Sequence, residues 1–162
     1  DWSSDVCSSD LAHVGIWTLR FIEIFEEVIA FEPQPENWEC LNANIGWSSG
    51  VKLIQCALGE CSGVAAMENP APDNSGAWET RPVNEEIFQK GKAIALETLD
   101  TWELKPDLIK MDVQGDEEKV LEGGRDTIRR YKPVLIIEGP TEWPLDLGYD
   151  LVETVSKDRV WA

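Results

Sequence analysis

The hydrophobic pattern alternates between short apolar runs that end in an acid and longer amphipathic segments. Three runs of this kind occupy residues 28–32, 108–112 and 134–138, and their terminal acids are Glu32, Asp112 and Glu138. Short continuous apolar runs are typical of parallel strands that are buried on both faces. Ligands of an open α/β sheet bind outside the carboxyl ends of its strands. The pattern therefore predicts an enzyme core with acids at one edge of its sheet.

The segments between these runs predict the remaining elements. Helical spacing of apolar residues predicts helices over 16–25, 35–45, 98–102 and 117–130. Further strands are expected at 51–57 and at 63–68 paired with 93–97. The tail over 148–155 and 159–161 is expected to form either one strand or two, the latter as a hairpin on the sheet edge. A Pro/Gly/Asn-rich loop is expected at 69–76. The fold class is thus α/β, with a mostly parallel sheet and an antiparallel C-terminal edge.

Residues 1–11 are expected to be a non-native segment. They show no helical or strand period, and they match, codon by codon, the translation of a common short-read sequencing adapter. The alternative is a natural Ser/Asp-rich terminus. Residues 12–162 then form a single truncated domain whose first strand is missing or replaced. An unbroken natural reading frame through residues 1–11 would contradict this expectation.

The composition limits the partners of the chain. The formal net charge is −17, and it stays strongly negative without the aspartates of residues 1–11. An acidic surface repels phosphate backbones, which argues against nucleic acids and anionic membranes as partners. The sequence contains no signal peptide and no long apolar run, so a cytoplasmic location is expected.

The cysteines do not predict a metal centre. Outside residues 1–11 the chain has Cys40, Cys56, Cys61 and a single histidine, His13, and no two of these form a Cys-x-x-Cys pair. A structural zinc site needs four such ligands, usually in close pairs. No metal is therefore expected, although carboxylate oxygens at Asp112 and Glu138 would suit magnesium or calcium.

Five motifs in order along the chain resemble the FkbM family of S-adenosylmethionine-dependent methyltransferases. They are Ala12-His-Val-Gly15, Phe31-Glu-Pro33, Asn42-Ala-Asn-Ile45, Thr98-Leu-Asp100 and the block from Ile109 to Glu117. Two departures stand out. The Asp and first Gly of the family's glycine-rich turn are absent, and Gln114 stands where the family usually has glutamate. The resemblance implies a Rossmann-like class I methyltransferase fold.

The resemblance also implies S-adenosyl-L-methionine as the cofactor and assigns residues to it. Glu32 is expected to accept hydrogen bonds from the ribose hydroxyls, next to Pro33, or else to be an ordinary acid before a helix. The turn Ala12, His13, Val14 and Gly15 would face the amino-acid part of the cofactor. Cys56 and Ala57 are expected either to line the adenine or to pack in the core.

The expected reaction is O-methylation of a hydroxyl on a small molecule or sugar. Asp112 is the first candidate for the base or for the group that orients the acceptor, followed by Glu138 and then Glu117. Glu117 has a second explanation as a first-turn helix acid. A nicotinamide-dependent oxidoreductase and a non-catalytic scaffold of the same fold are the alternatives, although Ala12-His-Val-Gly15 does not fit a Gly-x-Gly-x-x-Gly turn. The oligomeric state is not determined by the sequence.

Overall fold

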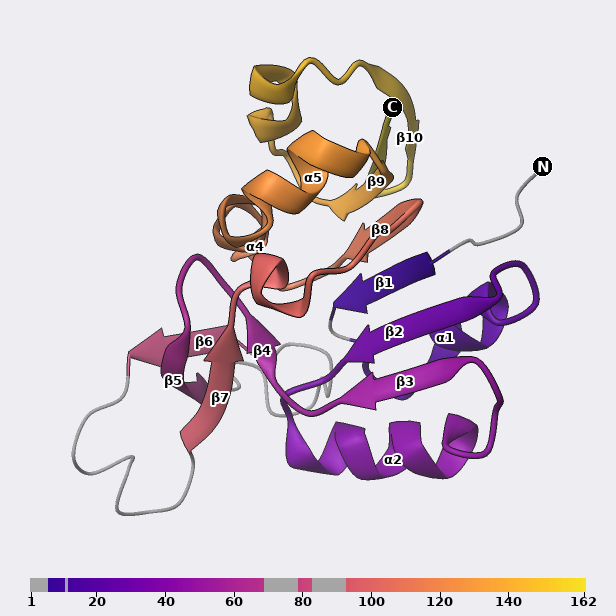
Figure 1. The fold of residues 1–162 in the computed structure, drawn as a ribbon. Helices are drawn as coiled ribbons and strands as arrows, with labels where there is room; N and C mark the ends of the chain where they lie inside the picture. Colours follow the sequence, from indigo (N-terminus) through magenta and orange to yellow (C-terminus); the bar gives the residue numbers. More distant parts are fainter. Residues whose placement is uncertain (1–5, 11, 69–78, 83–92) are drawn as a thin grey trace.

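The computed structural model describes residues 6–10, 12–68, 79–82 and 93–162. Within these residues the core is a seven-stranded sheet (Figure 1). In spatial order its strands are β10 (Leu151–Val155), β11 (Asp158–Trp161), β9 (Val134–Glu138), β8 (Leu108–Met111), β1 (Val6–Asp10), β2 (Glu27–Phe31) and β3 (Val51–Ile54). The strands from β9 to β3 are parallel, and β11 is antiparallel to both β9 and β10. The predicted α/β class with an antiparallel C-terminal edge is confirmed.

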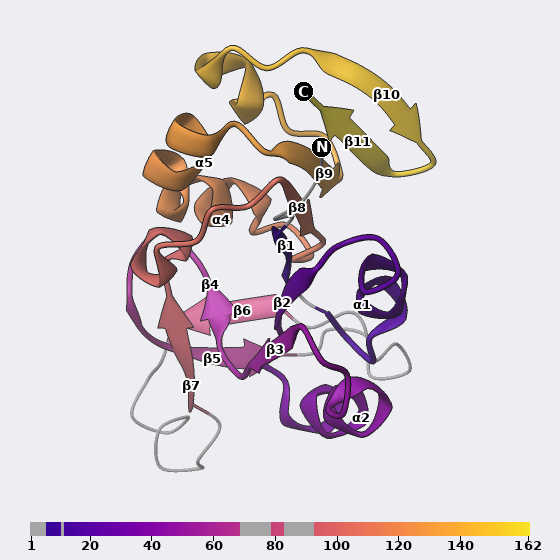
Figure 2. The ribbon, with the colours of Figure 1, turned by 45° about the vertical axis from the view of Figure 1, so that its right-hand side comes forward.

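Both faces of β2 are buried, which explains its continuous apolar sequence. On β2, Val28 and Ala30 belong to clusters on one face, whereas Ile29 and Phe31 belong to the largest cluster on the other. The helices α1 (Ile16–Phe21) and α2 (Pro35–Ile45) cover the first face, and α4 (Glu117–Gly123) and α5 (Arg125–Tyr131) cover the second (Figure 2).

The local sequence explains the most regular helix, α2. Pro35 lies in its first turn, where a missing N–H costs nothing. The side chain of Gln34 caps the helix by accepting a 2.6 Å hydrogen bond from the amide of Asn37. Leu41 and Ile45 are fully buried against the sheet. The predicted range of 35–45 is confirmed.

A second, four-stranded sheet follows β3 in the chain. It has the order β4 (Ala57–Leu58), β7 (Ala93–Glu97), β5 (Gly63–Glu68) and β6 (Glu79–Pro82) within the described residues. The predicted pairing of 63–68 with 93–97 is confirmed, and its direction is antiparallel. Two 3-10 helices, η1 (Leu99–Trp102) and η2 (Trp143–Leu147), complete the connections.

Three expectations about elements were wrong. The helix predicted for 117–130 is interrupted at Gly124, and the helix predicted for 16–25 ends at Phe21. The strand predicted for 51–57 divides into β3 and β4, which belong to different sheets. The first strand was expected to be missing or replaced; its central place between β2 and β8 is taken by β1, which falls within residues 1–11, so its replacement by a non-native segment stays a prediction. The origin of residues 1–11 stays a prediction, and the loop predicted at 69–76 lies outside the described residues.

Candidate functional site

Two of the predicted acids meet at the carboxyl ends of adjacent strands. Asp112 directly follows β8 and Glu138 ends β9. Met111 of β8 and Ile137 of β9 are paired in parallel register. The side-chain amide of Gln114 donates to Asp112 Oδ1 over 2.6 Å and lies 3.4 Å from Glu138 Oε2. The amide therefore holds both carboxylates in one cluster.

The proximity of the two acids changes the chemistry of Glu138. Hydrogen bonding to the Asp112 carboxyl group, followed by burial and charge repulsion, raises the pKa of Glu138 above its ordinary value. The ammonium group of Lys157, 3.5 Å from Glu138 Oε1, acts in the opposite direction. A carboxylate with a raised pKa is a stronger base than one that is free in water, so the pair is suited to accept a proton.

Two substitutions should move the pKa of Glu138 in opposite directions. Asp112→Asn removes the neighbouring acid, so the pKa of Glu138 should fall. Lys157→Met removes the cation that favours the charged form, so the pKa should rise, by a smaller amount because Lys157 is largely exposed. Carbon-detected NMR titration of the side-chain carboxyl groups measures both changes. An unchanged Glu138 pKa in the Asp112→Asn variant would contradict the pairing.

The loop after Asp112 is ordered by Glu117. Gln114 and Gly115 both have positive φ angles, of 54° and 104°, so this turn is unusual for an ordinary residue such as Gln114. Glu117 Oε1 accepts hydrogen bonds from the amides of Val113 (3.1 Å) and Gly115 (3.2 Å). This position favours the structural explanation of Glu117, as an acid that shapes the turn which carries Gln114.

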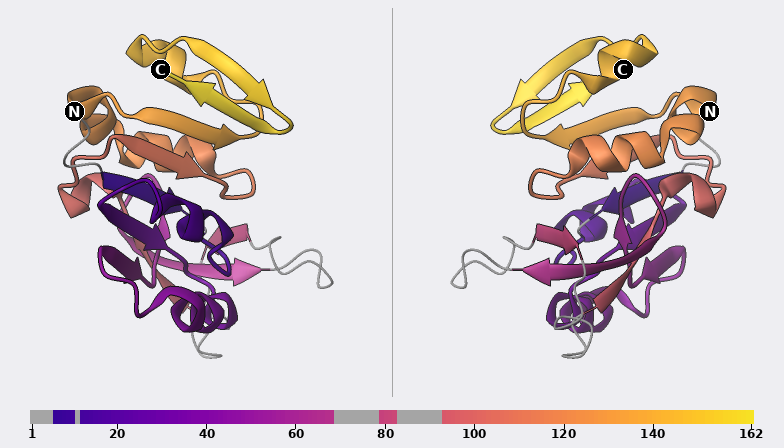
Figure 3. Two further views of the ribbon diagram at one scale, coloured as in Figure 1. Left: turned by 90° about the vertical axis from the view of Figure 1, so that its right-hand side faces the viewer. Right: turned by 90° about the vertical axis from the view of Figure 1, so that its left-hand side faces the viewer.

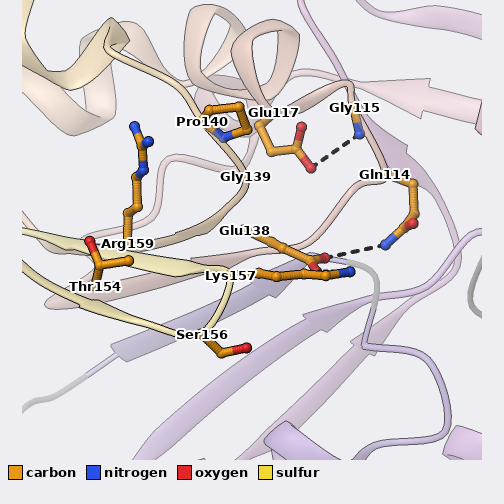
Figure 4. A pocket seen from close by; sticks show the side chains of 10 residues that line it. All are labelled: Gln114, Gly115, Glu117, Glu138, Gly139, Pro140, Thr154, Ser156, Lys157 and Arg159. Atoms are coloured by element: carbon orange, nitrogen blue, oxygen red, sulfur yellow. Dashed lines mark hydrogen bonds and ion pairs between the residues drawn. The ribbon is translucent and has the colours of Figure 1, made fainter.

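The acid cluster opens into a cavity of about 530 Å³ (Figure 4). One part of its wall comes from Gln114, Glu117 and Glu138, and the opposite part comes from the β10–β11 hairpin. Figure 3 shows that this hairpin forms one end of the large sheet, next to β9. Its turn is tied to the site because the amide of Gly139 donates to Lys157 O over 3.0 Å.

Glu32 lies apart from this cavity, at the end of β2. Its carboxylate is fully buried and accepts hydrogen bonds from the amides of His13 (2.8 Å) and Gln34 (2.9 Å), one on each oxygen. Burial raises the pKa of Glu32 to about 7, although these amides and the side chain of Asn37 lower it in part. Glu32 therefore joins the turn after β1 to the start of α2.

The other residues assigned to the cofactor surround Glu32 or lie further along the sheet. Ala12 is buried and His13 has a positive φ of 52°. The carbonyl of Val14 accepts a 2.8 Å hydrogen bond from Asn44, and Gly15 packs against α2, where an added Cβ would lie 2.4 Å from Ile45 Cδ1.

Pro33, Cys56 and Ala57 are all buried. Cys56 belongs to the main core cluster, which favours the packing explanation for that residue.

Sequence reasoning missed two parts of the site. Gln114 was seen only as a departure from a family motif, although an amide between two strand-end acids is the signal that would have indicated its bridging position. The residues Thr154, Ser156, Lys157 and Arg159 were missed because only the pairing of β11 with β9 brings the hairpin to the acids. Among the described residues, no three His, Cys, Asp or Glu side chains form a potential metal site. No described helix has the length and apolar character needed to cross a membrane.

Comparison with solved structures places the fold in the class I methyltransferases. A methyltransferase FkbM from Methylobacillus flagellatus KT superposes with a TM-score of 0.71 at 20% identity, over 98% of this chain and 44% of that one. The precorrin-6y C5,15-methyltransferase of Geobacter metallireducens GS-15 gives a TM-score of 0.51 at 13% identity, over 98% and 78% of the chains. An rRNA methylase from Streptococcus thermophilus gives 0.52 at 11% identity, over 98% and 84%.

The family is defined by sequence as well. The model of the methyltransferase FkbM domain matches residues 12–146, so the chain belongs to the FkbM methyltransferase family. The predicted family is confirmed. The chain spans less than half the length of the FkbM methyltransferase structure that it matches. A search of curated proteins finds no match.

Proposed function

We propose that this domain catalyses S-adenosylmethionine-dependent O-methylation of a hydroxyl group on a small molecule or sugar. The observation that carries the proposal is the Asp112–Glu138 pair, bridged by Gln114, of which Glu138 and Gln114 line a cavity of about 530 Å³. Cavities that bind small molecules typically measure about 300–1,000 Å³. Family membership and fold support methyl transfer in general.

The hydrogen-bonding groups at the end of β2 fit the ribose of the cofactor. A carboxylate has about four acceptor sites; the amides of His13 and Gln34 and the side chain of Asn37 use three of them on Glu32, which leaves capacity for a hydrogen bond from a ribose hydroxyl. The side chain is fully buried in this conformation, so its surroundings would have to shift for a ribose hydroxyl to reach it. Glu32 would hold the ribose, and the turn Ala12–Gly15 the amino-acid part. When bound, the cofactor supplies an electrophilic methyl group.

The residues of the acid cluster would prepare the acceptor. Asp112 or Glu138 accepts the hydroxyl proton, and the raised pKa of Glu138 suits that role. Gln114 fixes the orientation of both carboxylates through its amide. Well-oriented reacting groups gain about 7–11 kcal/mol from proximity and avoided reorganisation. Holding the acceptor in place therefore contributes more to the rate than accepting its proton does.

Replacing Glu32 by glutamine should weaken the binding of S-adenosylmethionine roughly tenfold to a hundredfold. The loss corresponds to one or more hydrogen bonds to a charged group, at about 1.5–3 kcal/mol each. Titration calorimetry measures the affinity, and Glu36→Gln, at an exposed position on α2, is the matched control. Equal affinities for both variants and the unsubstituted chain would refute the ribose role of Glu32.

One titration separates the proposal from its alternatives. The chain is titrated with S-adenosylmethionine and, separately, with NAD. Binding of S-adenosylmethionine alone supports the methyltransferase, and transfer of a labelled methyl group to a panel of hydroxylated glycosides then tests the acceptor class. Binding of NAD would favour an oxidoreductase, and binding of neither would favour a non-catalytic scaffold of the same fold.

A further inference from the structure

The cavity beside the acid cluster has two chemically different ends. In Figure 4, Gln114 lies on one side, Arg159 and Thr154 lie on the other, and Glu138 lies between them. The acidic end belongs to the segment that matches the family model, which ends at residue 146. The hairpin that forms the other end follows this segment.

The basic end of the cavity is built by the register of the hairpin. Thr154 of β10 and Arg159 of β11 are direct partners in the antiparallel pair, so their side chains project from the same face. On its other side, Arg159 is paired with Ile137 of β9, the residue before Glu138. Arg159 therefore lies on the strand next to β9, which ends in the acid, and Thr154 lies one strand further away.

Arg159 retains most of its hydrogen-bonding capacity. Its Nη1 donates to Thr141 O over 3.3 Å, which uses one of five N–H groups. Among the described residues, no Asp or Glu forms an ion pair with it, although the chain has 31 acids and 14 Lys and Arg residues. By contrast, Lys157 in the same hairpin is paired with Glu138.

We infer that Arg159 and Thr154 form an anion subsite that binds a carboxylate or phosphate group of the hydroxylated acceptor. The planar guanidinium matches either group through two parallel hydrogen bonds. The inference rests on the proposed function, because it takes the acceptor hydroxyl to lie at Asp112 and Glu138. The acceptor is accordingly an acidic sugar or a sugar phosphate rather than a neutral glycoside.

Three sugars test the subsite by binding, independently of turnover. Dissociation constants are measured by NMR titration for methyl β-D-glucuronide, glucose 6-phosphate and the neutral methyl β-D-glucoside. At least one of the anionic sugars should bind roughly tenfold more tightly than the glucoside, as one charged hydrogen bond provides. Selection of only one of them identifies the anion as carboxylate or phosphate. Equal binding of all three overturns the inference.

Substitutions show whether the preference for anionic sugars comes from Arg159. Arg159→Gln should abolish the preference for the anionic sugars, and Arg159→Lys should restore part of it. Arg20→Gln removes the same charge from exposed α1 and should leave the preference unchanged. A preference that survives in Arg159→Gln overturns the inference. If that variant does not fold, the Nε–H resonance of Arg159 is followed in the unsubstituted chain during the sugar titrations. Only the anionic sugars should shift this resonance, and an equal shift with the neutral glucoside overturns the inference.

The same samples keep this inference separate from the proposed function. Titration with S-adenosylmethionine should give equal affinities for the unsubstituted chain and Arg159→Gln. If neither the unsubstituted chain nor Arg159→Gln binds the cofactor, the proposed function is removed. The sugar titrations would still show whether Arg159 selects an anion. Cofactor binding without any anion preference would retain the methyltransferase and remove the subsite.

Discussion

Replacing Gly123 by alanine should lower the free energy of unfolding by about 3 kcal/mol or more. An added Cβ would lie 1.9 Å from the carbonyl oxygen of Gly59 and 3.0 Å from its carbonyl carbon. Both are backbone atoms, so no side-chain rotation relieves the overlap. The Gly59 amide also donates to Glu97 O over 2.9 Å, which ties this backbone to β7. Overpacking typically costs about 1–3 kcal/mol and occasionally more, which exceeds the roughly 1 kcal/mol that alanine gains over glycine in a helix.

Urea denaturation followed by circular dichroism measures this loss. Gly63→Ala in β5 is the matched control, because its added Cβ meets no atom within 4 Å and its φ is not positive. The control should stay within about 0.5 kcal/mol of the unsubstituted chain. Similar denaturation midpoints for the two variants would show that α4 does not approach Gly59 as closely as the structure indicates.

The contact between Gly123 and Gly59 illustrates what the sequence could and could not predict about the fold. Local signals were sufficient for α2, where Pro35 and the Gln34 cap mark the start of the helix. They were not sufficient for the helix predicted over 117–130, whose apolar spacing continues across the break at Gly124. The close approach of Gly123 joins residues 64 positions apart, so no local pattern indicates it.

The candidate site shows the same limit. The strand-end rule predicted acids at one edge of the sheet, and the structure places Asp112 and Glu138 together there because their strands are neighbours. It did not predict that Glu32 would be enclosed by backbone amides, which depends on how the turn after β1 packs against α2. The rule also did not predict the position of Arg159, because that position depends on the antiparallel pairing of β11 with β9, which is a long-range contact.

The hairpin that carries Arg159 is attached to the sheet by a buried ion pair. Lys110 on β8 is almost fully buried, and its Nζ lies 3.0 Å from Asp158 Oδ1 at the start of β11. The same ammonium donates to Met111 O over 3.2 Å and lies 5.7 Å from the centre of the Trp17 ring. The pair thus joins two strands that are separated by β9.

Replacing Asp158 by alanine should lower the free energy of unfolding by about 3 kcal/mol. The substitution leaves the Lys110 charge buried without its carboxylate, and breaking such pairs typically costs about 3–5 kcal/mol. We expect the lower end of this range because Asp158 is partly exposed. Lys110→Met should cost less, since the remaining acid can reach water and methionine retains most of the apolar volume.

The double variant Lys110→Met/Asp158→Ala separates the ion pair from simple packing. If the buried charge is the main cost, the double variant should be more stable than Asp158→Ala alone, because no unpaired charge remains. Thermal and urea unfolding of the four proteins give the coupling energy. Additive losses would mean that the two side chains stabilise the protein independently. In that case the hairpin is held to the sheet by its backbone ladder with β9, and the position of Arg159 does not depend on Lys110.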